Sequence, residues 1–480
     1  MPPDPPGADP HRPGDAKEAA RRHTADLGCW AARLSWSDVP DSVRERLSLV
    51  LLDTLAVTLA GARTEGQRRI RAAWPTPPGD APVLGAGVLT QADTAAYLNA
   101  TALVCSELDE GGKYAKGHPA GHAFPAILAL AASMGSPGEA TARALLAGYE
   151  VAARFGRATS LAPGVHPHGN WGVTGAAAGC AILLGLPASQ VAAAVDTAAA
   201  LPVAGHFDSA LDGHRARDAW MAAAAVNGLA AARLAAAGVV RNTGTAALSL
   251  GRLLGDFDAP VLTGALGEDW QIEHNYFKRH AACSYTHPAA DLALELRARH
   301  LSTRTGAQVV DAVTEVRVDT HALAAPLNRT RWDGGLAAMF SIPYTVATAL
   351  LDGAVAPGTA DATEADRPDI HALARKVAVA EDPALTARLP RERPTRLTAV
   401  LEGGRRVELR APGPVGDSDH HPFTPHSLAA VLADLLGDGA LVDRLRRTAD
   451  DLPAAGDVGP PLRELARLTT GTAAAQGGIA

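Results

Sequence analysis

The first half of the chain carries apolar residues at the spacing of a helix. In the stretch "SVRERLSLVLLDTLAVTLAGA", Val43, Leu47 and Val50 fall on one face, and Gly61 marks the helix end. Several further stretches of this kind follow, separated by short loops rich in glycine and proline. They are apolar on several faces, so other helices must bury them. The pattern predicts a large all-helical domain over residues 21–275.

The apolar pattern changes in the second half. In "VVDAVTEVRVDT", Val313, Val316 and Val318 alternate with polar residues, which is typical of a strand, and "PTRLTAVLEGGRRVELRA" predicts a hairpin around its "EGG". The stretch "GGLAAMFSIPYTVATALLDG" between them predicts a helix. We therefore expect a smaller α+β domain over residues 276–410, and helices in residues 411–470 that return to the helical domain. The predicted fold class is mainly α.

The start of the chain has a different character. Its sequence, "MPPDPPGADPHRPGDAKEAARRH", is rich in proline and charge and lacks the apolar core of a signal peptide. We expect residues 1–20 to form a disordered tail. No run of ~18 uncharged apolar residues with membrane flanks is present, and shorter stretches such as "GAAAGCAILLGL" suit buried core helices. The sequence thus predicts no membrane partner.

Composition and charge narrow the class of protein. The 480 residues suffice for two or three domains. The formal net charge of −7 argues against a nucleic-acid binder, which usually carries a basic patch. The four cysteines are widely spaced and form no CxxC motif, which argues against a paired-cysteine zinc site and a disulfide framework. These features predict a cytoplasmic protein.

Candidate chemistry first gathers in the stretch "ELDEGGKYAKGHPAGHAFPAIL". A predicted helix ends there in three carboxylates, including Asp109, and a glycine-rich loop brings His118 and His122. Carboxylates and imidazoles this close can form an acid–base pair, although a solvated helix end with a flexible loop would look the same. The two histidines are four residues apart, but Pro119 breaks the helical register that a metal pair needs. We predict no metal site.

Two further groups also stand before predicted helices. His166 and His168 precede the glycine-rich start of "NWGVTGAAAG", where free N–H groups attract anions. The alternative is that a histidine caps or packs against the loop. Arg215 and Arg217 begin the helix "ARDAWMAAAA" and can clamp a carboxylate in a bidentate way. A surface ion pair is the alternative for these arginines.

The fourth group lies in "YFKRHAACSYTHPAADLALEL". Lys278 and Arg279 can hold carboxylates, and His287, followed by proline, marks a helix start. Cys283 can exchange a proton if nearby cations tune its thiol, or it can be a small buried apolar residue. Together, the four groups suit a cleft for a small anionic substrate. Such a cleft fits chemistry in which a proton next to a carboxylate is removed and charge builds on oxygen.

At these same residues the chain resembles the MmgE/PrpD family, which includes 2-methylcitrate dehydratase, cis-aconitate decarboxylase and iminodisuccinate epimerase. The resemblance covers about residues 25–450 and is carried by "LLDTLAVTLAGA", "GHPAGHAFPAILALA", "HPHGNWGVTGAAAGCAILLGL", "FKRHAACSYTHPAADLALEL" and "MFSIPYTVATALLDG". It implies a cofactor-independent homodimer with a helical domain built from both ends of the chain. It also implies that the smaller α+β domain is a lid, with the active site between the two.

The resemblance also assigns individual positions. The positions that match the family's functional residues are Asp109, His118, His166 and Lys278. Arg217 stands where the decarboxylases and dehydratases have lysine, and Cys283 stands where the decarboxylase has histidine. These two departures predict a changed acid–base set and changed carboxylate contacts, because arginine and lysine bind carboxylates differently.

We therefore predict a lyase, with a hydro-lyase as the leading form, that removes the α-proton of a small di- or tricarboxylate. The predicted catalytic residues are Asp109, His118, His166, Lys278 and Cys283, and the predicted substrate-binding residues are Arg217, Lys278, Arg279 and His287. One of the two histidines would be the base, and the other histidine or the thiol would return a proton. The alternatives are an epimerase or isomerase of a carboxylic acid and a non-catalytic carboxylate-binding relative. We expect no cofactor and no nucleic-acid partner.

Overall fold

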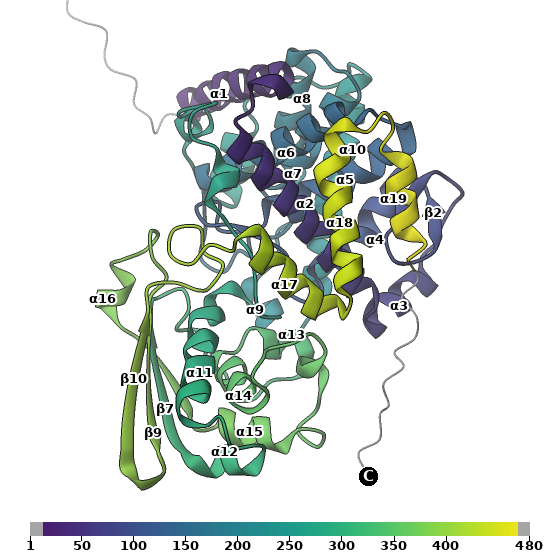
Figure 1. Ribbon diagram of the computed structural model, residues 1–480. Helices are drawn as coiled ribbons and strands as arrows, with labels where there is room; N and C mark the ends of the chain where they lie inside the picture. The colour runs from purple at the N-terminus through teal and green to yellow at the C-terminus, as the bar shows by residue number, and fades with distance from the viewer. Residues whose placement is uncertain (1–12, 469–480) are drawn as a thin grey trace, which may run out of the picture.

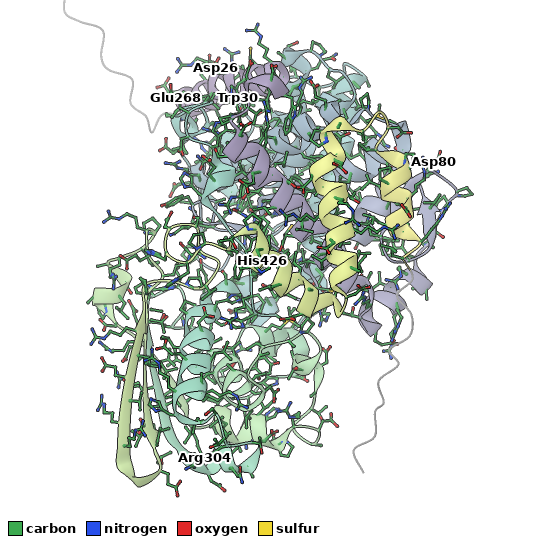
Figure 2. All side chains as sticks on the ribbon, viewed as in Figure 1. Asp26, Trp30, Asp80, Glu268, Arg304 and His426 are labelled. Carbon is green, nitrogen blue, oxygen red and sulfur yellow. The ribbon has the colours of Figure 1, made fainter. Side chains whose placement is uncertain are left out.

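A computed structural model describes residues 13–468 of the chain, which is mainly helical, as the sequence predicts. Figure 1 shows an upper part made of helices from both ends of the chain and a lower part that contains a β-sheet. This sheet has four strands. Figure 2 places Asp26 and Trp30 at one end of the molecule and Arg304 at the other, with His426 between the two parts. Each part has its own hydrophobic core.

The upper part contains most of the helices. Its N-terminal helices are α1 (Pro13–Arg33), α2 (Asp41–Ala62), α3 (Glu65–Ala73), α4 (Ala92–Val104), α5 (Pro119–Met134), α6 (Gly138–Ala158), α7 (Val173–Leu183), α8 (Ala188–Ala199) and α10 (Ala216–Ala236). Its C-terminal helices are α17 (Pro425–Leu436), α18 (Gly439–Asp451) and α19 (Gly459–Ala466). Helices α17 and α18 pack on α2, and α19 packs on α5. Both ends of the described chain therefore build one helical core.

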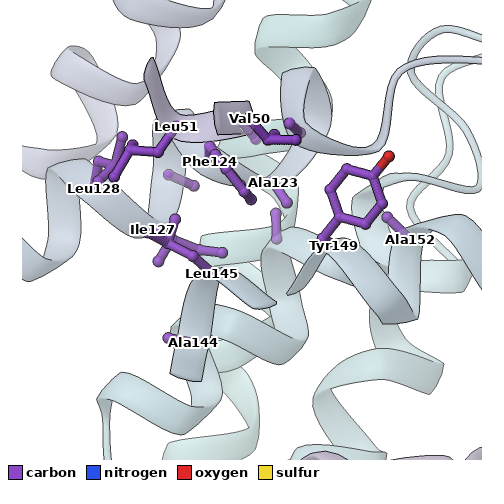
Figure 3. Close-up of a cluster of buried hydrophobic side chains, with 14 of the residues drawn as sticks. Val50, Leu51, Ala123, Phe124, Ile127, Leu128, Ala144, Leu145, Tyr149 and Ala152 are labelled. Carbon is purple, nitrogen blue, oxygen red and sulfur yellow. The ribbon is translucent and has the colours of Figure 1, made fainter. Parts of the chain in front are cut away.

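Close approach between helices organises this core. Helices α5, α6, α7 and α10 contact one another, and Figure 3 shows side chains such as Phe124, Ile127 and Tyr149 packed together. A Cβ atom on Gly148 of α6 would lie 3.0 Å from the carbonyl oxygen of Gly175 in α7, and one on Gly175 would lie 2.3 Å from that of Gly148. The α6–α7 crossing therefore needs glycine at both positions, because no side chain fits between the backbones.

The start of the chain differs from the sequence-based prediction. Helix α1 begins at Pro13, so residues 13–20 are helical rather than part of a disordered tail, and residues 1–12 lie outside the described residues. Ala20 and Leu27 are fully buried, and α1 packs along α8. Charged residues on its other face gave the segment its polar composition. Packing of one narrow apolar face stabilises the helix despite that composition.

The lower part is an α+β unit. Its sheet has the order β10-β9-β7-β8, formed by β7 (Val313–Thr320), β8 (Val377–Glu381), β9 (Thr395–Leu401) and β10 (Arg405–Ala411). The predicted strand at Val313 and the predicted hairpin around "EGG" are confirmed, since β9 and β10 pair antiparallel from Leu401 and Arg405. Its helices are α11 (His287–His300), α12 (Ala307–Ala312), α13 (Gly334–Met339), α14 (Ile342–Asp352), α15 (Pro368–Ala374) and α16 (Pro383–Thr386). Helices α11 and α14 contact the sheet, and Leu397 and Val316 are fully buried.

Further short strands lie outside the four-stranded sheet. They form three pairs: β1 (Ala81–Val83) with β2 (Val88–Thr90), β3 (Gly111–Gly112) with β6 (Asn275–Tyr276), and β4 (Thr159–Leu161) with β5 (Gly255–Phe257). The β3–β6 pair brings the loop after α4 against the segment that enters the lower part. Helix α9 (Phe207–Leu211) belongs to the upper part in sequence, but its Leu211 packs in the lower core. The domain boundaries at residues 275 and 410 stay predictions.

Helix α10 is long and apolar enough to cross a membrane. Helices α2 and α3 taken together also have the required length and apolar composition, although they are bent by 81° relative to each other. Half of the apolar window of α10 is buried inside the protein, where the helix contacts α4, α7 and α8. Core helices of this kind are apolar because they are surrounded by other helices. The packing of α10 therefore accounts for its apolar character.

Candidate active site

A cavity of about 560 Å³ lies between the two parts. Its polar and charged lining residues include Glu107, Lys116, His118, Ser160, His166, His168, Asp208, Arg217, Tyr276, Cys283, Ser284, Tyr285 and Arg393. They come from the loop after α4, the loop before α7, the start of α10, the segment around β6 and the approach to β9. The cavity thus gathers side chains that are far apart in sequence.

Asp109 and His118 form a buried pair at this cavity. Nδ1 of His118 lies 3.1 Å from Oδ2 of Asp109 and 2.6 Å from the backbone oxygen of Glu110. Burial alone would lower the pKa of His118, but the negative charge of Asp109 and the hydrogen bond between them raise it to about 9. Burial also opposes the charged form of Asp109, yet His118 and Lys278 lower the pKa of its carboxyl. His118 is therefore an imidazolium at neutral pH, and its Nε2 is not engaged in these contacts.

His122 has a structural role. Its Nδ1 donates to the backbone oxygen of His118 over 2.7 Å, and its Nε2 accepts from the backbone N–H of Gly169 over 3.1 Å. Burial lowers the pKa of His122 to about 4, so the ring is neutral and both nitrogens are used. Within residues 13–468 there is no group of three or more His, Cys, Asp or Glu side chains arranged to hold a metal ion. His122 fixes the loop before α7 against the start of α5.

The other two histidines line the cavity in neutral form. Nδ1 of His166 accepts from the backbone N–H of His168 over 3.1 Å, which places the proton of His166 on Nε2. Burial and the nearby charge of His118 lower the pKa of His166 to about 3. Burial and the neighbouring imidazoles also hold the pKa of His168 well below its ordinary value. The ring of His168 lies 5.0 Å from that of His118 and 4.5 Å from that of His166, so it sits between them.

Glu107 neutralises two of the predicted carboxylate-binding cations. Its carboxylate contacts the guanidinium of Arg217, and its Oε2 lies 3.1 Å from Nζ of Lys278. Lys278 also lies 3.8 Å from Oδ1 of Asp109, and all four side chains are buried. Glu107 has a φ of 55°, which is uncommon for a residue other than glycine and is found at functional sites. Lys278 and Asp109 therefore support the cavity from behind Glu107 and His118 rather than lining it.

Cys283 lines the cavity as the sequence predicts, but as a thiol. Burial raises its pKa, although the cations Lys278 and Arg217 act in the opposite direction. Its backbone N–H donates to the oxygen of Met339 over 2.9 Å, which ties the segment after β6 to α13. The thiol can donate a proton but is not a preformed thiolate.

Two more predicted substrate-binding residues, Arg279 and His287, do not line the cavity, and the same is true of Lys278. The side chain of Arg279 is 40% exposed and lies 3.5 Å from Asp291, beside a separate surface hollow. His287 is buried at the start of α11, with Nε2 3.1 Å from the oxygen of Ala282. Arg279 follows the buried Lys278 in an irregular stretch, so the two side chains point in different directions. Arg279 therefore forms a partly exposed ion pair, and His287 marks the start of α11.

The cavity also contains residues that the sequence-based prediction missed. The guanidinium of Arg393 lies over the ring of Tyr276 at 4.9 Å and over that of Tyr285 at 5.4 Å. Burial raises the pKa of the Tyr276 phenol, but the positive charges of His118 and Arg393 outweigh it and lower that pKa overall. Arg393 stands in "RLPRERPTRL", and nothing in this arginine-rich stretch distinguishes it from its neighbours. The position of Arg393 at the cavity depends on tertiary contacts, which cannot be read from the local sequence.

The fold and the cavity define a mainly helical protein with a buried imidazolium–carboxylate pair between a helical part and an α+β part. Residues 25–251 match the model of the MmgE/PrpD N-terminal domain, and residues 280–437 match that of the MmgE/PrpD C-terminal domain. The chain belongs to the MmgE/PrpD family. This finding confirms the resemblance drawn from the sequence motifs.

Two relatives show how similar the chain is to known members. It is 26% identical over 381 residues to the cis-aconitate decarboxylase of Aspergillus terreus (strain NIH 2624 / FGSC A1156), covering 74% of this chain and 77% of that protein. It is 30% identical over 328 residues to the cis-aconitate decarboxylase-like protein oryM of Aspergillus oryzae (strain ATCC 42149 / RIB 40), covering 63% of this chain and 67% of that protein.

Proposed function

We propose that the protein is a cofactor-independent lyase of the dehydratase or decarboxylase type, with a hydro-lyase as the leading form. Its substrate would be a small di- or tricarboxylate, and the reaction would begin with removal of a proton next to a carboxylate. The family and the names of the two relatives support the reaction class. The observation that carries the proposal is the buried Asp109–His118 pair, whose imidazolium lines a cavity shared by both parts of the molecule.

In this proposal His118 is the acid. Asp109 keeps the imidazolium charged and holds Nδ1, so Nε2 delivers the proton to a leaving hydroxide or to a carbanion. His166 carries its proton on Nε2 and donates a hydrogen bond to the oxygen on which charge builds. This differs from the sequence-based hypothesis, which left either histidine as the base.

The base in this proposal is His168. Its ring is neutral, lines the cavity, and has no hydrogen bond in the described part of the chain that fixes its tautomer. Burial and the charge of His118 lower the pKa of His168 in the empty site. A bound dicarboxylate brings negative charge close to the ring, which raises that pKa towards the range of a useful base. The thiol of Cys283 is the second proton donor, on the wall formed by the segment after β6.

We also propose that the smaller part moves during the reaction and that two chains assemble. Residues 276–410 would act as a lid that closes on the helical part and excludes water during the reaction. In the segment that leaves this lid for α17, Asp417 and Asp419 pair with Lys113, whose Nζ lies 3.0 Å from the buried Asp417 and 2.6 Å from the partly exposed Asp419. The active protein would be a homodimer located in the cytoplasm. Light scattering on the purified protein tests the dimer, since the proposal requires a mass of two chains.

A screen in deuterated water tests the reaction class. The protein is incubated with a panel of di- and tricarboxylic acids, and deuterium incorporation, alkene absorbance and carbon dioxide release are followed together. A His118→Gln variant should lose activity by roughly 10²- to 10⁴-fold, the usual contribution of a positioned proton donor. Deuterium at the α-carbon without alkene or carbon dioxide would instead indicate an epimerase. Binding without any exchange or turnover would indicate a non-catalytic relative.

A further inference from the structure

Arg393 is a buried cation that forms no ion pair with a carboxylate within residues 13–468. Its residue is 5% exposed and lines the cavity, and its Nη1 has no hydrogen-bond partner in the described part of the chain. Among the described residues, its Nη2 donates to the backbone oxygen of Lys113, over 3.3 Å. Two tyrosine rings face the guanidinium and contribute cation–π contacts.

The other buried cations nearby are paired. Arg217 and Lys278 share the carboxylate of Glu107, and Lys113 pairs with Asp417. An unpaired buried guanidinium is costly, because the protein replaces none of the hydration that the charge has lost. A ligand carboxylate accepts two parallel N–H bonds from a guanidinium and removes this cost. Within residues 13–468, Arg393 is therefore a buried guanidinium of the cavity that is left for a ligand; Lys116 also lines the cavity, but it is exposed and its Nζ donates to the backbone oxygen of Thr159.

The remaining wall of the cavity is apolar. Its large apolar residues are Leu161, Val165, Phe207, Leu211, Leu323 and Phe340. Phe207 stacks on His166 at 5.1 Å and meets Phe340 edge-on at 5.9 Å, so this wall begins beside the histidines. Leu323 is 50% exposed, whereas Phe340 is 4% exposed, so the wall runs from the interior to the mouth. A wall of this kind can bury an apolar substituent of a ligand while the end of that substituent approaches solvent.

We infer that the cavity binds an acid whose carboxylate pairs with Arg393 and whose apolar arm lies along the wall from Phe207 to Leu323. The substrate class is then a dicarboxylate that carries an alkyl or aryl substituent, rather than a bare tricarboxylic acid. A volume of about 560 Å³ lies within the ~300–1,000 Å³ typical of sites for ligands of drug size. This inference rests on the proposed function for the reaction, but it assigns the binding site independently of turnover.

A homologous series of acids tests the apolar arm. Succinate, butylsuccinate and hexylsuccinate are titrated into the protein by calorimetry at one pH and one ionic strength. Affinity should rise by roughly threefold to fourfold for each methylene that becomes buried. In a Leu323→Asn variant, which makes the wall polar without adding a charge, the gain in affinity from succinate to hexylsuccinate should be smaller than in the wild type. Equal affinities of the wild-type protein for all three acids would overturn the apolar arm.

Variants of the guanidinium test the carboxylate partner. Arg393→Met should weaken binding of hexylsuccinate by roughly 10- to 100-fold, the usual effect of losing a charge-assisted hydrogen bond. Arg393→Lys keeps the charge and should recover part of this loss. Arg279→Met is the matched control, because it removes an arginine that lies outside the cavity and should leave the affinity unchanged. Circular dichroism and thermal unfolding of each variant establish that the fold is retained.

The outcomes separate this inference from the proposed function. If Arg393→Met binds hexylsuccinate as tightly as the wild type, the inference is wrong even if the enzyme turns over other acids. If binding depends on Arg393 but no acid undergoes exchange, dehydration or decarboxylation, the inference stands and the proposed reaction fails. If Arg393→Met does not fold, Arg393→Lys takes its place in the test. Lysine cannot make a bidentate contact. If Arg393→Lys binds every acid with wild-type affinity and wild-type dependence on ionic strength, the inferred contact is wrong.

Discussion

Oδ2 of Asp109 lies 3.1 Å from Nδ1 of His118, and both side chains are buried at the boundary between the two parts of the molecule. The short sequence from one residue to the other folds back because the β3–β6 pair and the start of α5 hold its ends. The pair keeps a positive charge on an imidazole that burial alone would make neutral. Predictions about charge, pH and stability follow from this contact and its neighbours.

Removal of the Asp109 charge should lower the pKa of His118 below its present value of about 9. In Asp109→Asn, burial and the positive charge of Lys278 are no longer opposed, so the imidazole should be neutral at pH 7. Activity should fall by roughly 10²- to 10⁴-fold. Nuclear magnetic resonance titration of the His118 ring gives the pKa directly. Asp208→Asn is the control, since that exposed carboxylate lines the cavity without pairing to His118, and it should leave the titration unchanged.

The rate of the reaction should fall as pH rises through about 9. The pKa of His118 is raised in the folded protein, so the proton it must deliver is present below about 9 and is lost above it. The same shift contributes to stability, and this contribution is complete below the unfolded pKa of ~6.5 and is lost as pH rises through about 9. The pH dependence of kcat and of thermal unfolding checks both effects. A rate that instead increases up to pH 9 would show that His118 is the base.

Neutralising Glu107 should destabilise the empty protein. In Glu107→Gln, Arg217 and Lys278 lose their shared carboxylate while they stay buried, and breaking such a pair costs about 3–5 kcal/mol. A bound dicarboxylate can replace the missing charge, so succinate should raise the Tm of this variant more than that of the wild type. Glu139→Gln, an exposed change in α6, serves as the control. Equal Tm values for Glu107→Gln and wild type in the absence of ligand would contradict the pairing.

The α6–α7 crossing should not tolerate a side chain. In Gly148→Ala, the new Cβ would lie 2.7 Å from Cδ1 of Ile127 and 3.0 Å from the oxygen of Gly175, which should cost about 1–3 kcal/mol. Gly66→Ala in α3 meets no atom within 4 Å and should stabilise the protein by roughly 0.5–1 kcal/mol, because alanine favours the helix. Chemical denaturation of the two variants measures both effects. A stabilising Gly148→Ala would mean that the two helices lie further apart.

The sequence alone determined the helical first half, the strand at Val313, the hairpin before Arg405, and the motifs around His118 and His166 that carry the family. These features are local, because helical spacing, strand alternation and turn residues act over a few positions. Local composition misled where one narrow apolar face decides the structure, as in α1, which begins at Pro13 within the expected tail. It also predicted one helix over residues 334–353, which the structure divides into α13 and α14.

Only the tertiary structure decided which side chains meet. Lys278 pairs with Glu107 across 171 positions, and Arg393 reaches the cavity from the segment just before β9. The neighbouring Arg279 points to solvent instead. Whether a cation is paired, left for a ligand or exposed depends on contacts between distant segments and on burial. The type and local spacing of residues determine neither these contacts nor the burial. The sequence could therefore identify candidate site residues but could not assign their partners.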